Sequence, residues 1–329
     1  MLIRVLFIII GCFSLSAYGA VPLNEPLKLI SVNLIDSDYP LEPSGLANCG
    51  DKILLISDKF DEVFWLKPGE QSARADVYMH ITAPMLPLPK FMHAKDEFKQ
   101  KLREMLTKFT FDWESISCDD AGHVYIGSER NTNILQVDLP AETTPIKTAA
   151  GKWILNGFDE YAKNQHFFEV FNAGLESMTW RKGGFILAAE RSPRGLFNLD
   201  LDDSGWHLKN MAKIPPNGLA PIATSATKPD FSDVYVEANK IYTLERYTGA
   251  VCRRAMSSFE LEKCWSYREV ENDPKWIYRH HRYGVAEGLA VFQNRIYITT
   301  DNNLETREAA PKDARPELYQ FQLPPDWSE

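Results

Sequence analysis

The chain carries acidic residues at repeated spacings, and such a set could bind a metal cation or move protons. Each of five segments has a first-position residue and, 12 to 15 residues later, a second-position acid. The first-position residues are Ser44, Glu114, Glu176, Asp233 and Glu287. The second-position acids are Asp58, Glu129, Glu190, Glu245 and Asp301, and they are followed by Lys59, Arg130, Arg191, Arg246 and Asn302.

Acids that converge on one place repel one another unless positive charge compensates them. A hard cation such as Ca²⁺ is one compensation, because it takes roughly 6 to 8 oxygen ligands. The candidate ligands for it are Glu129, Glu190, Glu245, Asp301 and Asn302. Alternatively, the basic residue that follows four of these acids could pair with carboxylates of neighbouring segments and leave no role for a ligand.

The five segments recur every 54 to 70 residues, and each contains a run of β-forming residues such as Ile53-Leu-Leu-Ile56. A first-position residue, a turn and a second apolar run fit two short strands joined tightly. Repetition at this period is typical of a β-propeller, in which each copy is one four-stranded blade around a central channel. The sequence therefore predicts an all-β propeller with five or six blades, the sixth lying in 67–110 or 198–231.

Elements outside the repeat are expected to close the ring or decorate its rim. The segment 27–34 should pair with the alternating strand Leu318–Leu323, which would remove exposed sheet edges. Apolar residues at helical spacing predict an inserted helix over 94–109, and a second short helix is expected around 158–168. One propeller domain over 20–329 follows, because a closed ring cannot be cut into independent halves.

The first nineteen residues have the pattern of a secretory signal peptide. Arg4 precedes an apolar stretch, and Ala17-Tyr-Gly19 offers a small-residue cleavage site. We therefore expect a periplasmic or secreted protein; a lipid anchor at Cys12 is the less favoured alternative. No later apolar run is long enough to cross a bilayer as a helix. The net charge of −9 argues against a nucleic-acid partner.

Four cysteines remain after the predicted leader, and an even number in an exported chain favours disulfides. Cys252 and Cys264 are close in sequence, which favours that pair. Cys49 and Cys118 are then paired by elimination. The alternative is that all four are buried free thiols.

Six short motifs follow one another along the chain: Glu114-Ser-Ile, Ser128-Glu-Arg130, Gly174-Leu-Glu-Ser-Met178, Leu244-Glu-Arg246, Glu287-Gly-Leu289 and Thr300-Asp-Asn-Asn303. Their order resembles the phytase-like domain family, also labelled "esterase-like activity of phytase", a group of exported bacterial propeller proteins. The resemblance covers 44–323. The chain departs from the pattern at Ser44, where other copies have an acid, and at Asp233, which lacks the following Gly or Ser.

The family label implies hydrolysis of an ester or phosphoester. In that case Ca²⁺ would neutralise a phosphate and position a water, and a carboxylate would act as base. The candidate catalytic residues are Glu114, Glu176 and Glu287. The candidate substrate-binding residues are Arg130, Arg191 and Arg246, because a guanidinium matches phosphate oxygens.

Other catalytic templates are missing from the sequence. It contains no Gly-x-Ser-x-Gly elbow, no His-Glu-x-x-His and no Gly-x-x-x-x-Gly-Lys loop. Two alternatives to the hydrolase stay open. One is a non-enzymatic envelope protein whose propeller face binds a partner, such as another envelope protein, or a ligand. The other is a calcium-dependent lactonase-like propeller.

Overall fold

The computed structural model describes residues 24–84, 111–138, 147–170, 173–222, 228–279 and 284–329. The predicted leader and the predicted helix over 94–109 lie outside these residues. The strands described here are short and nearly all antiparallel, and the helices are shorter still.

The strands group into four-stranded antiparallel units, which follow one another along the chain. The first contains β3 (Pro43–Cys49), β4 (Lys52–Ser57), β5 (Glu62–Lys67) and β6 (Ser72–Thr82). The second contains β7 (Trp113–Cys118), β8 (His123–Ser128), β9 (Asn133–Asp138) and β11 (Lys152–Trp153). The third contains β12 (Leu175–Arg181), β13 (Gly184–Ala189), β14 (Gly195–Asp202) and β15 (Gly205–Lys213). The fourth contains β16 (Asp233–Glu237), β17 (Lys240–Glu245), β18 (Ala250–Ala255) and β19 (Leu261–Ser266). The fifth contains β20 (Ala286–Phe292), β21 (Arg295–Thr300), β22 (Glu317–Gln322) and β2 (Leu29–Asp36).

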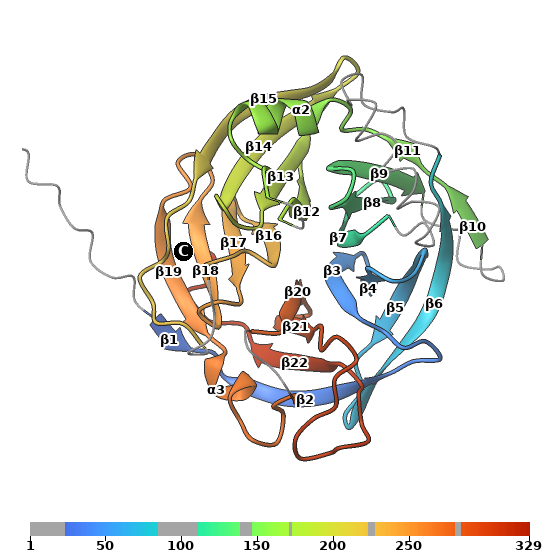
Figure 1. The fold of residues 1–329 in the computed structure, drawn as a ribbon, viewed down its shortest axis with the longest axis vertical. Helices are drawn as coiled ribbons and strands as arrows, with labels where there is room; N and C mark the ends of the chain where they lie inside the picture. Colours follow the sequence, from blue (N-terminus) through green and yellow to red (C-terminus); the bar gives the residue numbers. More distant parts are fainter. Residues whose placement is uncertain (1–23, 85–110, 139–146, 171–172, 223–227, 280–283) are drawn as a thin grey trace, which may run out of the picture.

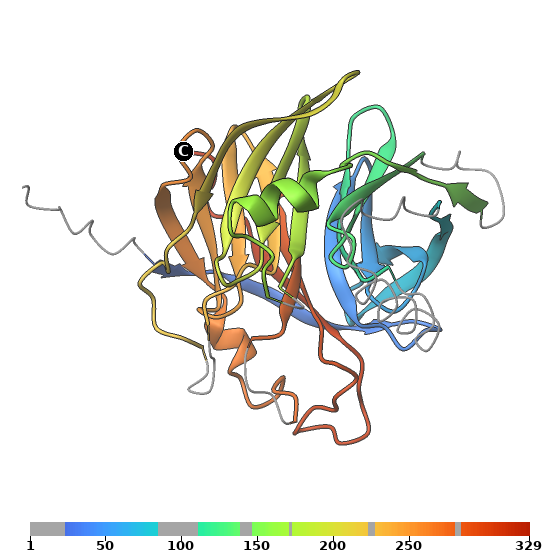
Figure 2. The same cartoon turned by 45° about the horizontal axis from the view of Figure 1, so that its top comes forward.

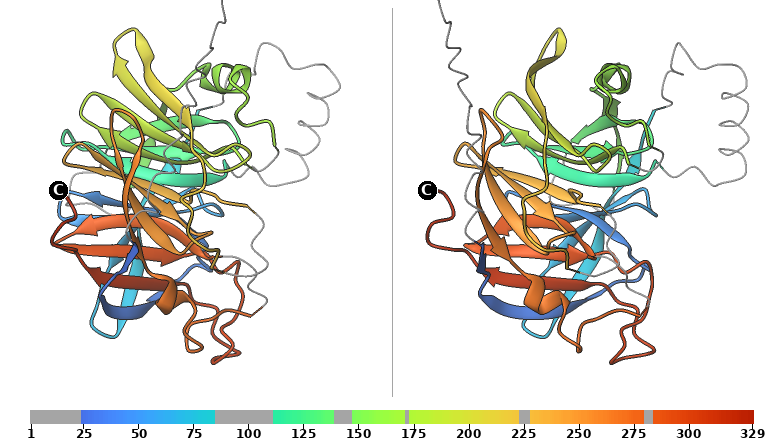
Figure 3. Two further views of the ribbon diagram at one scale, coloured as in Figure 1. Left: turned by 90° about the vertical axis from the view of Figure 1, so that its left-hand side faces the viewer. Right: turned by 60° about the vertical axis from the view of Figure 1, so that its left-hand side comes forward.

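These units are arranged around a common centre, so the fold is a β-propeller, as the repeat predicts (Figure 1). The first strand of each unit, β3, β7, β12, β16 or β20, lies nearest the centre, and later strands lie further out (Figure 1). Figure 2 shows the units side by side with the 301–316 connection projecting at one end of the ring. Two side views show the same stacking of the sheets around the axis (Figure 3).

Strand β2 closes the ring. It pairs antiparallel with β22, with Val32 opposite Tyr319, and parallel with β6, with Ile35 opposite Ala73. The first and fifth units therefore share one continuous sheet. The predicted pairing of 27–34 with 318–323 is confirmed, and it protects the edges that an open sheet would expose.

Four further elements lie outside the four-stranded units. Strand β1 (Asn24–Pro26) pairs with β19, and β10 (Lys147–Ala150) pairs with β6. The helix expected around 158–168 is present as α2 (Phe158–Asn164), and a second one-turn helix, α3 (Arg268–Glu271), precedes the fifth unit. The strands described within the two regions offered for a sixth blade belong elsewhere: β6 completes the first unit, and β14 and β15 complete the third.

The core lies between neighbouring sheets. In β4, Ile53 to Ile56 are all buried, because both faces of the strand are covered by adjacent units. One cluster joins the second strand of the fourth unit, Tyr242, with Leu289 and Tyr319 of the fifth. Trp327 packs on this cluster, stacked on Tyr242 with ring centroids 4.0 Å apart. The second strand of each unit is buried along nearly its whole length, between the sheets of the two neighbouring units.

The predicted disulfides are both present. Cys49–Cys118 joins β3 to β7 and so links the first and second units, while Cys252–Cys264 joins β18 to β19 within the fourth unit. Over the described residues, none of the helices is both long and apolar enough to cross a membrane.

The two disulfides should differ in their effect on stability. Cys49–Cys118 spans 69 residues and Cys252–Cys264 spans 12. A longer closed loop restricts the unfolded chain more, so replacing Cys49 and Cys118 together by Ala should cost about 1–2 kcal/mol more than replacing Cys252 and Cys264. Urea unfolding of the two double variants measures the difference. A larger loss for Cys252/Cys264 would contradict this account.

Candidate functional site

Many acids collect at one end of the channel, where the inner strands begin and the second strands end. The electrostatic neighbours of Glu114 include Asp58, Glu129 and Glu176, and those of Glu287 include Glu176 and Asp301. We call this group the acidic mouth. Its ten acids are Glu42, Asp58, Asp112, Glu114, Glu129, Glu176, Glu190, Asp230, Glu287 and Asp301, and its four basic residues are Lys59, Arg130, Arg191 and Arg246.

A β-bulge places the first-position residue at the start of four inner strands. The pairing register shifts by one residue between Pro43 and Gly45, Trp113 and Ser115, Leu175 and Ser177, and Ala286 and Gly288. Ser44, Glu114, Glu176 and Glu287 are the extra residues in these bulges. An extra residue is left out of the ladder and its strand bends there, which turns these side chains out of the regular sheet.

The fourth unit differs from the prediction by one residue. Asp233 of β16 pairs with Leu244 of β17. In the other units this pairing position, directly after the bulge, is held by Gly45, Ser115, Ser177 and Gly288. Ser232 therefore stands where Glu176 stands in the third unit. By the same register, Glu245 is the last residue of β17, and Arg246 follows the strand where Asp58, Glu129, Glu190 and Asp301 follow theirs. The prediction that Asp233 is a first-position residue and Glu245 a second-position acid is therefore wrong by one residue in each case.

The Arg246 side chain therefore lies among the acids of the mouth and is their main positively charged partner. Its Nε donates to Asp230 Oδ2 at 2.8 Å, and its Nη2 donates to Glu190 Oε1 at 2.8 Å. Nη2 also lies 3.3 Å from Glu176 Oε1, and Nη1 donates to Glu287. Arg246 is buried, so its charge is compensated by acids from three neighbouring units rather than by water.

Burial changes the protonation of the mouth. It raises the pKa of Glu176 to about 8, against the opposing effect of Arg246, and raises the pKa of Asp301 to about 6. Burial also raises the pKa of Glu114 well above its usual range, and the nearby Glu176 and Glu129 add to the shift. For Glu287 burial again raises the pKa far above the ordinary value despite Arg246. Part of the mouth therefore holds protons at neutral pH and can donate them.

Three carboxylates of the mouth are close enough to share a cation. Glu129, Glu176 and Glu190 are all buried, and each has an oxygen that lies within 4.8 Å of an oxygen of the other two. Glu129 and Glu190 follow β8 and β13, and Glu176 lies in the bulge of β12, so two neighbouring units build the cluster. Glu129 is fixed by the backbone N–H of Gly174, which donates to Oε1 at 2.8 Å.

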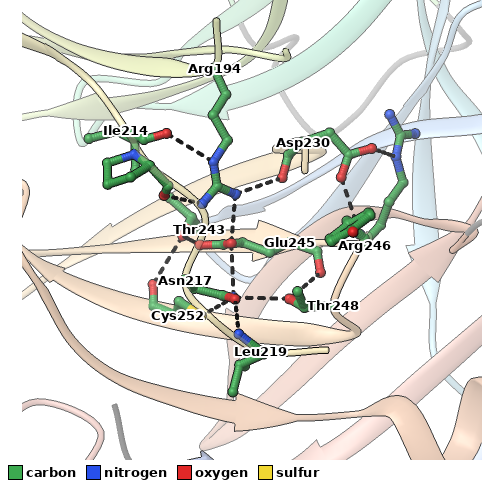
Figure 4. Close-up of polar contacts among 12 residues, drawn as sticks. Arg194, Ile214, Asn217, Leu219, Asp230, Thr243, Glu245, Arg246, Thr248 and Cys252 are labelled. Atoms are coloured by element: carbon green, nitrogen blue, oxygen red, sulfur yellow. Dashed lines mark hydrogen bonds and ion pairs between the residues drawn. The ribbon is translucent and has the colours of Figure 1, made fainter. Parts of the chain in front are cut away.

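Glu245 lies in a separate buried cluster (Figure 4). Arg194 Nη1 donates to Glu245 Oε2 at 2.7 Å (Figure 4). Arg254 Nη2 donates to Glu245 Oε1, also at 2.7 Å. Asn217 Nδ2 donates to Oε2 at 3.0 Å. Although burial opposes it, the two guanidinium groups hold the pKa of Glu245 below its usual range. Arg194 also donates to the carbonyl oxygens of Ile214, Pro215 and Asp230, which anchors both ends of the 214–230 connection.

Asp233 fastens the inner strands instead of facing the mouth. Its Oδ1 accepts from Ser177 Oγ at 2.5 Å, and its Oδ2 accepts from the backbone N–H of Leu289 at 2.6 Å. The backbone N–H of Leu46 is a further donor. Burial nevertheless raises the pKa of Asp233 to about 7. One carboxyl group therefore joins β12, β16, β20 and β3 across the channel.

The remaining predicted residues lie at the edge of the mouth or beside it. Arg130 lies 3.4 Å from Asp112 and is 42% exposed, while Arg191 pairs with Glu190. Asp301 accepts from the backbone N–H of Asn303 at 2.7 Å. The Asn302 side chain donates to the carbonyl oxygens of Glu305 and Ala314, so it holds the 302–314 loop together.

Three further acids, Glu42, Asp112 and Asp230, belong to the mouth without having been expected there. Each lies two residues before a first-position residue once the register of the fourth unit is corrected, namely before Ser44, Glu114 and Ser232. The recurrence of an acid two residues before the first-position residue could therefore have been predicted from the sequence. Arg194 was not, because it lies outside the repeat.

Comparisons with known proteins give a propeller fold and a partial family match. Residues 99–240 match the family model described as SdiA-regulated, a stretch that includes Glu114, Glu129, Glu176 and Glu190. No curated protein matches the chain in sequence.

The structure is similar to glutaminyl cyclase from Myxococcus xanthus, with a TM-score of 0.52 and 9% identity over 92% of this chain and 100% of that one. It also matches PQQ-bound aldose sugar dehydrogenase from Streptomyces coelicolor, with a TM-score of 0.46 and 11% identity over 92% and 99% of the two chains. A third match is the WD40 β-propeller domain of Doa1, with a TM-score of 0.41 and 10% identity over the same 92% and 99%. At these identities the likeness extends to the fold only.

Stability of the cation-free protein should fall as the pH rises from about 5 to 8. Glu176 has a pKa of about 8 when folded against 4.5 for a solvent-exposed glutamate, so the folded chain binds more protons in this window. Proton loss from the mouth then costs folding free energy. Thermal melting in chelator between pH 5 and 8 should show a falling Tm and a weaker fall in Glu176→Gln. A Tm that rises over this range would contradict the raised pKa values.

Replacing Glu245 by Gln should strongly destabilise the protein. It leaves Arg194 and Arg254 buried without their counter-charge, which typically costs about 3–5 kcal/mol. Glu262→Gln is the matched control, because Glu262 pairs with Lys240 and Arg253 of the same unit but is 25% exposed. Its loss should be about 0–1 kcal/mol. Urea unfolding of both variants tests this, and equal losses would refute the buried role of Glu245.

Proposed function

We propose that the acidic mouth binds a divalent cation and with it hydrolyses an ester or phosphoester, in a protein that is exported. The observation that carries the proposal is the cluster of Glu129, Glu176 and Glu190, three buried carboxylates from two units within reach of one ion. The resemblance to the phytase-like family supports the reaction class. The two disulfides are consistent with an oxidising compartment.

The donor set fits a hard cation. All three ligands are carboxylates, which suit Ca²⁺ better than a soft metal. The hydrogen bonds and ion pairs described for the three residues use Oε1 of each. The mouth as a whole has ten acids against four bases, so it has an excess of negative charge that Arg246 alone does not balance. A bound cation would supply positive charge that polarises the scissile group and activates water.

The chain's own residues supply proton transfer and orientation. Burial raises the pKa of Glu114 and of Glu287 well above the ordinary value and so favours their protonated forms, from which either can donate a proton to the leaving oxygen while water adds to the carbonyl or phosphoryl centre. Asp301, with a pKa of about 6, is ionised at neutral pH and can accept the proton that water loses. Arg246 fixes the directions of Glu176, Glu190 and Glu287, and Asp230 fixes Arg246 in turn.

A non-enzymatic binding protein is the second candidate, and Arg246 is the observation that favours it. The Arg246 guanidinium occupies the position that an acid has after the second strand of the other four units, and it pairs with four carboxylates. The mouth could then be a fastener between units, with the partner bound elsewhere on the propeller. The two candidates differ in whether the mouth has affinity for a cation.

Calcium binding should depend on pH and on the cluster. Glu176 must lose its proton to become a ligand, so calcium affinity should rise between pH 6 and 8 by up to about tenfold per pH unit. Glu176→Gln should abolish the effect. Isothermal calorimetry and the rise in Tm with calcium measure both.

Activity is tested on 4-nitrophenyl esters and 4-nitrophenyl phosphate with and without chelator. Glu169→Gln is the control, since this residue is 55% exposed and pairs only with His166 among the described residues. It should keep both calcium binding and turnover, whereas Glu176→Gln and Glu287→Gln should lose turnover while staying folded. A folded wild-type protein without calcium affinity or turnover would leave the second candidate.

A further inference from the structure

An open groove with a largely apolar lining lies beside the acidic mouth. One wall is the connection after β2, with Tyr39, Pro40 and Leu41, and the other is formed by 310–316 together with Leu304. Its volume is about 810 Å³, within the range of pockets that hold small organic ligands. We call it the apolar groove. Leu304 on its wall is 44% exposed, although a large apolar side chain in water has a hydration cost.

Hydrogen bonds and an ion pair between the two walls hold the groove in shape. The backbone N–H of Ile35 donates to the carbonyl of Pro316 at 2.9 Å. Arg315 Nη1 donates to Asp36 Oδ1 at 2.7 Å, and its other nitrogens bond Asp313. These contacts join the two walls and also neutralise most of the charge in the lining. The surface left for a ligand is therefore mainly apolar.

Each wall of the apolar groove is adjacent in the chain to an acid of the mouth. Leu41 is followed directly by Glu42, which lies 3.4 Å from Lys59 and contributes to the electrostatic environment of Asp301. On the other wall, Leu304 is three residues after Asp301. The groove therefore borders the carboxylates from two sides.

We infer that the apolar groove binds the acyl or aromatic portion of an ester substrate whose ester group lies at the acidic mouth. The inference rests on the proposed function and narrows it to esters with an apolar chain. A highly charged phosphoester fits this surface poorly, because the lining offers few unpaired cations and the neighbouring mouth is acidic. An apolar chain instead gains free energy for each methylene it buries.

Chain length tests the inference through kinetics. With 4-nitrophenyl acetate, butyrate and octanoate, kcat/KM of the wild type should rise at least tenfold from acetate to octanoate. Leu304→Asp should reduce the octanoate-to-acetate ratio at least fivefold. Leu29→Asp is the matched control, because Leu29 is 43% exposed and lies on β2 six residues before Ile35. It should leave the ratio unchanged.

A binding measurement separates this inference from the proposed function. Hexyl 4-nitrophenyl ether cannot be hydrolysed, and it should shift the methyl NMR signals of Leu41 and Leu304 in the wild type but bind at least fivefold more weakly to Leu304→Asp. If esters are turned over without chain-length preference and the ether leaves these methyls unshifted, the groove assignment is overturned and the hydrolase stands. If the ether binds there and no ester is turned over, the hydrolase fails and the groove stands as an apolar ligand site.

Discussion

A single buried guanidinium, that of Arg246, holds together acids from three neighbouring units of the propeller. It pairs with Glu176 and Glu190 of the third unit, with Asp230 before the fourth and with Glu287 of the fifth. Without it, these carboxyl groups could be buried together only by taking up more protons. The packing of the third to fifth units at the mouth therefore depends on Arg246, and so does the protonation of the mouth's carboxyl groups.

The same residue makes the mouth asymmetric. Four units contribute an acid after their second strand and one contributes Arg246, so the third to fifth units are partly neutralised. The side formed by the first two units has Asp58, Asp112 and Glu114 with Lys59 and Arg130. Glu129 and Glu176 lie at the boundary between these sides, where residues of the second and third units meet. A strictly symmetric ring would have no such boundary.

The acidic mouth and the apolar groove differ in chemistry, because the mouth is formed by acids and the groove is lined mainly by apolar groups. The groove is formed by the β2–β3 connection and the long loop before β22, and both of these belong to the ring closure. The strand pairing that closes the propeller thus also shapes the surface next to the acids. This is the part of the molecule that the repeated units alone do not build.

The sequence by itself determined the propeller, both disulfide pairs and most of the acids of the mouth. The five repeats can be aligned with one another, and each contains an apolar run that marks its strands. Glu42, Asp112 and Asp230 were also within reach, since they recur at one offset. Only the tertiary structure decided that Arg246 replaces an acid and that Glu245 pairs with Arg194 and Arg254. The physical reason is strand pairing. Asp233 pairs with Leu244 as Ser177 pairs with Ala188, so Arg246 follows β17 where Glu190 follows β13, although Glu245-Arg246 matches Glu190-Arg191 by residue type.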